Sequence, residues 1–257
     1  FDRVICTPHL GASTKEAQTN VAVAVAEQII DYLQTGTVQN AVNAPSVAGE
    51  VLEKVGPYIT VGDKMGMLQA QLACGPIKEI QIEYTGDFKD LDMAPVSIAI
   101  LKGLLTPMVA DMVNFVNAPI MAKDRGIKVL ETTSTHSEDF VNLITVRAVT
   151  EAGTSVVSGT IIGRSDPRIV QIDDFRLELV PEGHILLIFN DDKPGAIGRI
   201  GTILGTHAIN IGRMQVGQNL EGRSNIVFCQ TDTQVPDEVV AELRAADMVQ
   251  TVTPLEL

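Results

Sequence analysis

The alternation of strand-like and helix-like segments after residue 183 restricts the possible folds more than any other feature of this chain. Apolar runs rich in β-branched residues predict four strands, at 184–190, 210–216, 225–231 and 248–257. Helical periodicity after the first and the third run predicts two helices. The order βαββαβ, with right-handed crossovers, therefore predicts one four-stranded, ferredoxin-like sheet with both helices on the same face.

The first of these two helices is expected to follow the segment Asp192-Lys193-Pro194-Gly195. An Asp is a favoured N-cap and Pro is tolerated in the first turn, so Asp192 is the predicted cap. The second helix is expected over 236–245.

In the middle of the chain, the predicted secondary structure changes from mainly helical to strands at Gly126. Before it, helices are expected at 57–73, 96–105, 108–116 and 119–124, with one strand at 77–84. After it, alternating residues and polar turns predict strands at 129–135, 140–150, 155–162, 168–172 and 175–179. Helices followed by an antiparallel sheet predict an α+β domain.

The head of the chain begins with a β-like run at 3–7 that breaks at Thr7-Pro8-His9-Leu10-Gly11. Ser13 with Glu16 three positions later is typical of a capping box, so a helix of about twenty residues is expected to follow. Residues 37–49 lack periodicity and predict a linker between domains. Because Phe1 stands in what reads as the middle of a strand, we expect the chain to be a piece of a longer protein.

The charge balance and the absence of long apolar runs exclude several classes of partner. A formal net charge of -13 disfavours nucleic acid and anionic membrane surfaces. No apolar run reaches the roughly 18 residues of a membrane helix, and no signal peptide is recognisable, so a cytoplasmic protein is expected. The three cysteines are far apart and form no C-x-x-C pair, so no metal site is predicted.

Four segments carry a resemblance to a known family. Residues 190–199, Asn-Asp-Asp-Lys-Pro-Gly-Ala-Ile-Gly-Arg, and 207–211, His-Ala-Ile-Asn-Ile, resemble the ACT domain, a regulatory module that commonly senses amino acids. Residues 4–14, Val-Ile-Cys-Thr-Pro-His-Leu-Gly-Ala-Ser-Thr, and 40–43, Asn-Ala-Val-Asn, resemble D-3-phosphoglycerate dehydrogenases. The N-terminal motif, the order of the predicted domains and the ACT-like C-terminal segment together resemble the C-terminal part of the long-form members of that family.

The resemblance implies three parts and a biosynthetic role. Residues 1–46 would be a remnant of the catalytic region, 47–182 an intervening α+β domain that binds substrate or another anion, and 183–257 an ACT regulatory domain. The parent enzyme would oxidise 3-phosphoglycerate with NAD in the first step of L-serine biosynthesis, under feedback by L-serine. It would be a homo-oligomer joined through its ACT domains.

The resemblance assigns catalysis in the parent enzyme to His9, the general acid/base that exchanges a proton with the substrate hydroxyl while NAD takes the hydride. Histidine suits this role because its ordinary pKa lies near neutrality. The sequence contains no G-x-G-x-x-G fingerprint for a dinucleotide. The chain alone is therefore expected to be inactive and to hold no cofactor.

The predicted effector site consists of Asp192 and Asn210, with Asn190 beside them, where the family often has His or an aromatic residue. A zwitterion needs acceptors for its ammonium group and donors for its carboxylate, and these side chains with a helix N-terminus offer both. The resemblance implies that the amino acid binds between ACT domains of different subunits. Chemistry alone leaves an alternative open, in which neither residue binds a ligand: Asp192 would only cap the helix, and Asn210 would only begin the strand.

A second predicted site would bind a phosphorylated anion in the middle domain, with Arg168, Arg164 and Lys128 as candidates because Arg grips phosphate oxygens in a bidentate fork. Hydroxyl groups of Ser134, Thr135 and Ser137 could add donors, while a solvated polar rim is the alternative.

Two other assignments stay open at this point. One is a stand-alone amino-acid-binding ACT module, and the other is the regulatory part of an iron–sulfur L-serine dehydratase. The scattered cysteines and the Thr7-Pro8-His9-Leu10-Gly11 segment disfavour the dehydratase.

Overall fold

A computed structural model describes residues 4–35, 50–89, 91–135, 139–219 and 224–257. The predicted linker at 37–49, with its family-like segment at 40–43, and Ser137 lie outside the described residues. The chain divides into two units, Phe1–Gly49 and Glu50–Leu257, and each is described by itself.

The first unit consists of an irregular segment and the helix α1 (Lys15–Thr35). The strand expected at 3–7 is wrong, because residues 4–8 have no regular secondary structure. The expected cap is also wrong. The hydroxyl of Thr14, not Ser13, accepts a hydrogen bond from the amide of Ala17 at 3.1 Å. Ser13 instead donates to the carbonyl of Leu10 at 2.9 Å.

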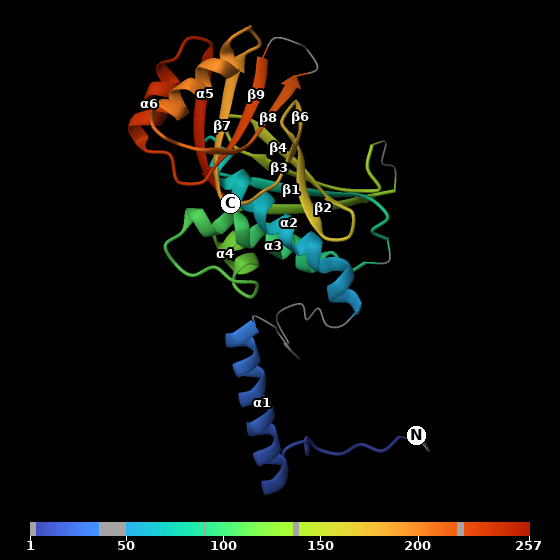
Figure 1. Ribbon diagram of the computed structural model, residues 1–257. Helices are drawn as coiled ribbons and strands as arrows, with labels where there is room; N and C mark the ends of the chain where they lie inside the picture. Colours follow the sequence, from blue (N-terminus) through green and yellow to red (C-terminus); the bar gives the residue numbers. More distant parts are fainter. Residues whose placement is uncertain (1–3, 36–49, 90, 136–138, 220–223) are drawn as a thin grey trace. The chain divides into compact units, whose positions relative to one another are not determined.

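The second unit contains a ten-stranded sheet with the order β10-β7-β9-β8-β6-β5-β4-β3-β1-β2 (Figure 1). Its strands are β1 (Glu79–Gly86), β2 (Lys128–Ser134), β3 (Asn142–Val149), β4 (Thr154–Ile162), β5 (Asp166–Ile172), β6 (Phe175–Leu179), β7 (His184–Asp191), β8 (Ile211–Asn219), β9 (Ser224–Thr231) and β10 (Val249–Glu256). Its helices are α2 (Glu50–Leu72), α3 (Ala94–Leu105), the 3-10 helix η1 (Thr106–Met108), α4 (Ala118–Asp124), α5 (Ala196–Thr206) and α6 (Asp237–Ala245).

In the first half of this unit, α2 and α3 pack on each other, and α2 also contacts β4 and β5. The core includes Val61, Met65 and Leu68 of α2, all fully buried. The two helices approach closely at Gly66, where an added Cβ would lie 2.0 Å from the carbonyl oxygen of Ile100. Such close backbone packing requires glycine at that point.

Two expectations for this half are corrected. The sheet is not wholly antiparallel, because β1 and β2 are parallel and the segment with α3 and α4 forms the crossover between them. The helix expected at 108–116 is wrong. Asn114 Oδ1 accepts from the amides of Val116 and Asn117, and Asn117 Oδ1 accepts from the amide of Asn114. Side-chain bonds of this kind offer the backbone an alternative to a helix.

The last four strands form the predicted βαββαβ unit, with the order β10-β7-β9-β8. On one face, Leu186 and Ile188 pack with Ile200, Leu204 and other residues of α5 and α6, which lie side by side (Figure 1). On the other face, residues such as Ile185, Leu187 and Phe228 join the core of the first half. The fold class predicted from the sequence is confirmed.

Strand β6 joins the two halves of the sheet. It pairs with β5 on one side and with the end of β8 on the other, where Phe175 faces Asn219 and Arg176 faces Gln218. Within the part of the chain that the structure describes, no helix is long and apolar enough to cross a membrane.

Candidate functional site

The loop between β7 and α5 is fixed to the sheet through Asp191. Its carboxylate accepts hydrogen bonds from Lys193 Nζ at 2.7 Å and from Gln250 Nε2 at 2.9 Å, and its amide donates to the carbonyl of Met248 at 2.8 Å. The hydrogen bond from Lys193, followed by that from Gln250, lowers the pKa of Asp191. Asp191 therefore anchors the loop to β10, a role that sequence reasoning missed.

Asp192 is exposed and does not cap α5. The N-cap is Gly195 in the left-handed region, with φ 95°, and it makes no side-chain hydrogen bond. Asp192 Oδ1 instead accepts from Asn225 Nδ2 at 2.9 Å, which links the loop to β9. The predicted cap is thus wrong, and the N-terminus of α5 presents main-chain amides beside a carboxylate.

Asn190 lies beneath this loop and is fully buried. Its Nδ2 donates to the carbonyl of Asp191 at 2.8 Å, while its Oδ1 has no partner among the residues that the structure describes. A buried acceptor without a donor costs roughly 1–3 kcal/mol. A donor group of a bound molecule would remove that cost.

Asn210 lies at the opposite end of the same sheet. His184 of β7 and Ile211 of β8 both pair with Thr231, whereas Asp191 pairs with Ser224 at the far end of β9. Since β7 has eight residues, roughly 25 Å separates the two ends at about 3.3 Å per residue. One chain therefore does not bring Asp192 and Asn210 together. The Nδ2 of Asn210 donates to Asp232 Oδ2 at 2.7 Å.

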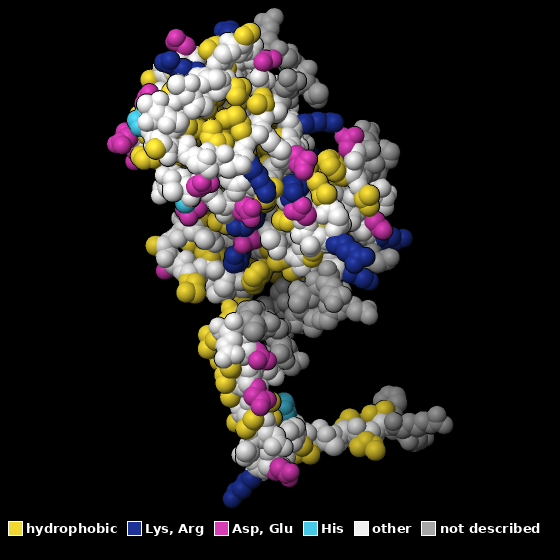
Figure 2. All heavy atoms as spheres, viewed as in Figure 1, with side chains coloured by type: hydrophobic (Ala, Val, Ile, Leu, Met, Phe, Trp, Pro, Cys, Tyr) yellow, Lys and Arg dark blue, Asp and Glu magenta, His cyan; other side chains and the backbone are white. Residues whose placement is uncertain are grey.

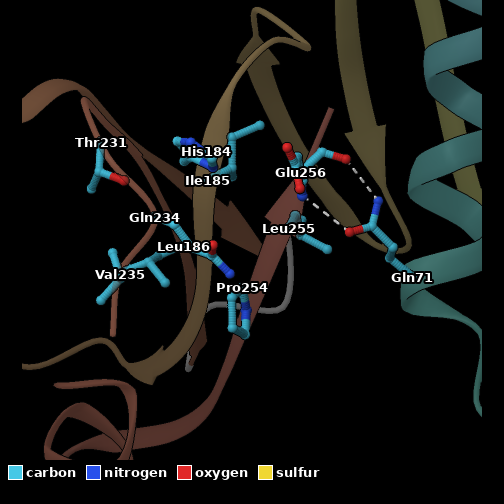
Figure 3. A pocket seen from close by; sticks show the side chains of 10 residues that line it. All are labelled: Gln71, His184, Ile185, Leu186, Thr231, Gln234, Val235, Pro254, Leu255 and Glu256. Carbon is cyan, nitrogen blue, oxygen red and sulfur yellow. Dashed lines mark hydrogen bonds between the residues drawn. The ribbon is translucent and has the colours of Figure 1, made fainter. Parts of the chain in front are cut away.

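A pocket of about 210 Å³ lies at the Asn210 end of the sheet (Figure 3). His184 and Thr231 line it, together with Gln71 from α2. The side-chain amide of Gln71 forms two hydrogen bonds with the main chain of Glu256 in β10. It donates to the carbonyl and accepts from the amide of Glu256, each at 3.0 Å. This clamp fixes α2 to the last strand.

The two arginines predicted to bind an anion line different pockets. Arg168 lines one of about 320 Å³ between β6 and β8, together with Arg213. Its guanidinium is bonded to Asp166 and, at 3.3 Å, to Glu178, and the bond to Asp166 chiefly raises its pKa. Arg164 lines a pocket of about 550 Å³ in the first half of the unit.

The remaining candidates are dispersed. Lys128 pairs with Glu79 at 3.2 Å on the outer strand β2, and Thr135 is exposed just after that strand. His9 is exposed in the irregular segment before α1, and its catalytic role stays a prediction. The described ranges hold no group of three or more His, Cys, Asp or Glu side chains suited to a metal ion.

Two families match consecutive parts of the chain. The D-3-phosphoglycerate dehydrogenase intervening domain matches residues 54–173, and the ACT domain matches residues 184–247. The chain belongs to the D-3-phosphoglycerate dehydrogenase family. It corresponds to the C-terminal region that contains the intervening and ACT domains. Strand β6 lies between the two matched ranges, so the segment that connects the domains is itself part of the sheet.

Curated relatives agree with this assignment. The D-3-phosphoglycerate dehydrogenase of Synechocystis sp. is 38% identical over 244 residues, which cover 95% of this chain and 44% of the relative. Those of Bacillus subtilis and Methanocaldococcus jannaschii are 37% and 36% identical, and cover 99% and 100% of this chain. The chain spans about half the length of these D-3-phosphoglycerate dehydrogenases.

Proposed function

We propose that this chain is the regulatory portion of an NAD-dependent D-3-phosphoglycerate dehydrogenase and that its ACT domain senses L-serine. In this proposal residues 1–46 belong to the catalytic region, 47–182 form the intervening domain and 183–257 form the ACT domain. His9 is the general acid/base of the whole enzyme. The match of residues 54–173 to the intervening domain favours this proposal over a stand-alone ACT module or a serine dehydratase.

The observation that carries the proposal is the position of the predicted effector residues at opposite ends of one sheet. Asp192, Asn190 and the N-terminus of α5 lie at one end, and Asn210 lies at the other. Two copies related by a two-fold axis across β8 would place Asn210 of one copy toward the Asp192 end of the other, because a two-fold axis reverses the strand direction. Serine would then bind between subunits.

The chemistry of the Asp192 end suits a small zwitterion. The Asp192 carboxylate accepts from an ammonium group, and the open amides of α5 favour a carboxylate. Asn190 Oδ1, buried without a partner among the described residues, supplies one further acceptor for a hydroxyl or ammonium donor. L-serine has all three complementary groups.

Strand β6 supplies the link to the intervening domain. It occupies the Asn219 end of β8, so a second copy that pairs along the whole of β8 must displace β6. The sheet then has two arrangements: β6 paired with β8, or a second copy paired along β8. Serine requires the paired copies, so it would bind the second arrangement better than the first. Such differential binding is what an allosteric effect requires.

Calorimetry of the 257-residue chain with L-serine tests the proposal. Asp192→Ala and Asn210→Ala should each weaken binding at least about tenfold, since each removes a charged or dipolar partner. Glu238→Ala, an exposed carboxylate on α6, is the matched control and should bind as the parent does.

Mixing the two weak variants gives the decisive result. In a mixed dimer, one site carries both substitutions and the other carries neither. Each mixed dimer should therefore bind one serine with the affinity of the parent chain. No recovery on mixing, or an unchanged affinity of Asp192→Ala, would contradict a site shared between copies. So would a monomeric mass in saturating serine.

A further inference from the structure

The pocket of about 210 Å³ at the end of the sheet where β7 begins has a polar wall beside an apolar one (Figure 3). Glu256 of β10 and Thr231 of β9 both pair with His184 of β7. Residues that lie directly opposite in antiparallel strands present their side chains on the same face. Pro254 pairs with Leu186 in the same way, two residues further along each strand. The polar row and the apolar row therefore lie side by side on one face of the sheet.

Two of the hydrogen-bond donors that line this pocket are already used, whereas acceptors beside them are free. Thr231 is 5% exposed, and its hydroxyl donates to the carbonyl of Thr233 at 2.8 Å, which leaves lone pairs on the hydroxyl oxygen. Gln71 Nε2 donates to the carbonyls of Met67 and Glu256, at 3.1 and 3.0 Å. A ligand that donates hydrogen bonds therefore suits the pocket better than one that accepts them.

The charge of the pocket favours a cation. The carboxylate of Glu256 is exposed and forms no ion pair with any side chain in the described ranges. Among the described residues that line the pocket, none is lysine or arginine. The net charge of the chain, -13, adds a general attraction for cations.

The size and the apolar wall of the pocket favour a short carbon chain. Leu186 and Val235, at 1% and 5% exposure, line it together with Pro254. Contact with these side chains removes the apolar part of a ligand from water. The volume lies below the roughly 300 Å³ at which sites for drug-sized ligands begin, so the ligand is small.

We propose that this pocket binds a small primary amine in its ammonium form. The ammonium group donates to the Glu256 carboxylate and to the Thr231 hydroxyl oxygen. The carbon chain lies against Leu186, Val235 and Pro254. The site uses none of the residues of the proposed serine site and does not depend on the binding of serine.

Gln71 is a positioning residue in this proposal. It reaches from α2, in the intervening domain, and holds the main chain of Glu256 in the βαββαβ unit. The position of the Glu256 carboxylate therefore depends on the contact between the two domains. By linkage, a bound amine stabilises that contact as much as the contact strengthens amine binding.

Calorimetric titration of the 257-residue chain with n-butylammonium chloride tests the site. Glu256→Gln should weaken binding about tenfold, because it removes the charge and keeps the main-chain bonds to Gln71. Glu131→Gln is the matched control. It removes an exposed carboxylate from β2, at the opposite edge of the sheet, and should leave the affinity unchanged.

A series of probes defines the class of ligand. Ethylammonium should bind about tenfold more weakly than n-butylammonium, since each buried methylene contributes up to about fourfold in affinity. Butyrate and 1-butanol have similar carbon chains without the cation, and both should bind at least about tenfold more weakly. Tighter binding of butyrate would contradict a cation site. In the parent chain, the amide resonances of His184 and Thr231 should shift on titration with n-butylammonium, which requires no variant to fold.

Gln71→Leu tests the link between the domains. It should weaken n-butylammonium binding about fivefold in the parent chain and little in the Glu256→Gln background, because Gln71 acts through that carboxylate. Equal losses in both backgrounds would contradict the positioning role of Gln71.

Three results would overturn the proposal. One is the lack of saturable binding of n-butylammonium below about 10 mM, an affinity too weak for a specific site. Another is a loss in Glu131→Gln equal to that in Glu256→Gln, which would indicate general charge attraction. The third is a loss in Asp192→Ala with none in Glu256→Gln, since that would place the amine at the proposed serine site.

Discussion

The two long helices of this chain have similar lengths and different surroundings. Helix α1 has 21 residues and α2 has 23. The apolar stripe of α1 is exposed, with Val25 at 47%, Ile29 at 53% and Leu33 at 76%, and Figure 2 shows hydrophobic side chains along its surface. The apolar stripe of α2, by contrast, is fully buried. Helical periodicity thus predicts that a helix forms and does not say what covers it.

The largest expected effect is the loss of a buried side chain from α2. Leu68→Ala should lower the free energy of unfolding of residues 50–257 by about 3–4 kcal/mol, because it leaves a cavity in a fully buried site. Leu33→Ala in α1 is the matched control and should change stability by less than about 0.5 kcal/mol. Urea unfolding followed by circular dichroism measures both. Equal losses would show that α1 is as well packed as α2.

A smaller loss is expected from crowding the contact between α2 and α3. In Gly66→Ala the new Cβ would lie 2.0 Å from the carbonyl oxygen of Ile100 and 2.7 Å from the amide nitrogen of Leu104. The helices must separate, at a cost of about 2–3 kcal/mol in the same urea experiment.

The control for this substitution is Gly201→Ala in α5, where an added Cβ meets nothing within 4 Å. Alanine should stabilise that helix by about 0.5–1 kcal/mol. If Gly66→Ala also stabilised the protein, the close contact of the two helices would be refuted.

The smallest effect concerns the start of α1. Thr14→Ala removes the hydroxyl that accepts from the amide of Ala17, so the first turn should lose about 1 kcal/mol. Hydrogen exchange at the Ala17 amide measures this local loss. Ser13→Ala should have less effect on that amide, because the Ser13 hydroxyl bonds outside the helix. The reverse order would restore Ser13 as the cap.

Local patterns in the sequence predicted most helices and strands, and their order predicted the ACT fold. Local side-chain chemistry was less predictable. Asp192 has the residue type and position of a helix cap, yet its carboxylate bonds to Asn225, which is distant in sequence. The helix expected at 108–116 fails because Asn114 and Asn117 bond the backbone of their own loop.

Long-range pairings were least predictable. Two examples are the parallel pairing of β1 with β2 and the pairing of β6 with β8. The periodicity of a strand predicts which of its side chains are buried, and it does not predict which other strand lies beside it. For the same reason, sequence reasoning placed Asp192 and Asn210 in one site without showing that they lie at opposite ends of the sheet. The unpaired oxygen of Asn190 is a feature of the folded interior alone.

The position of β6 has a consequence for solubility. This strand, Phe175–Leu179, has five residues and separates five strands on one side of the sheet from four on the other. If it leaves, β5 and β8 both become sheet edges with unsatisfied main-chain groups, and such edges invite association with other chains. A variant that weakens this short strand is therefore expected to aggregate before it unfolds.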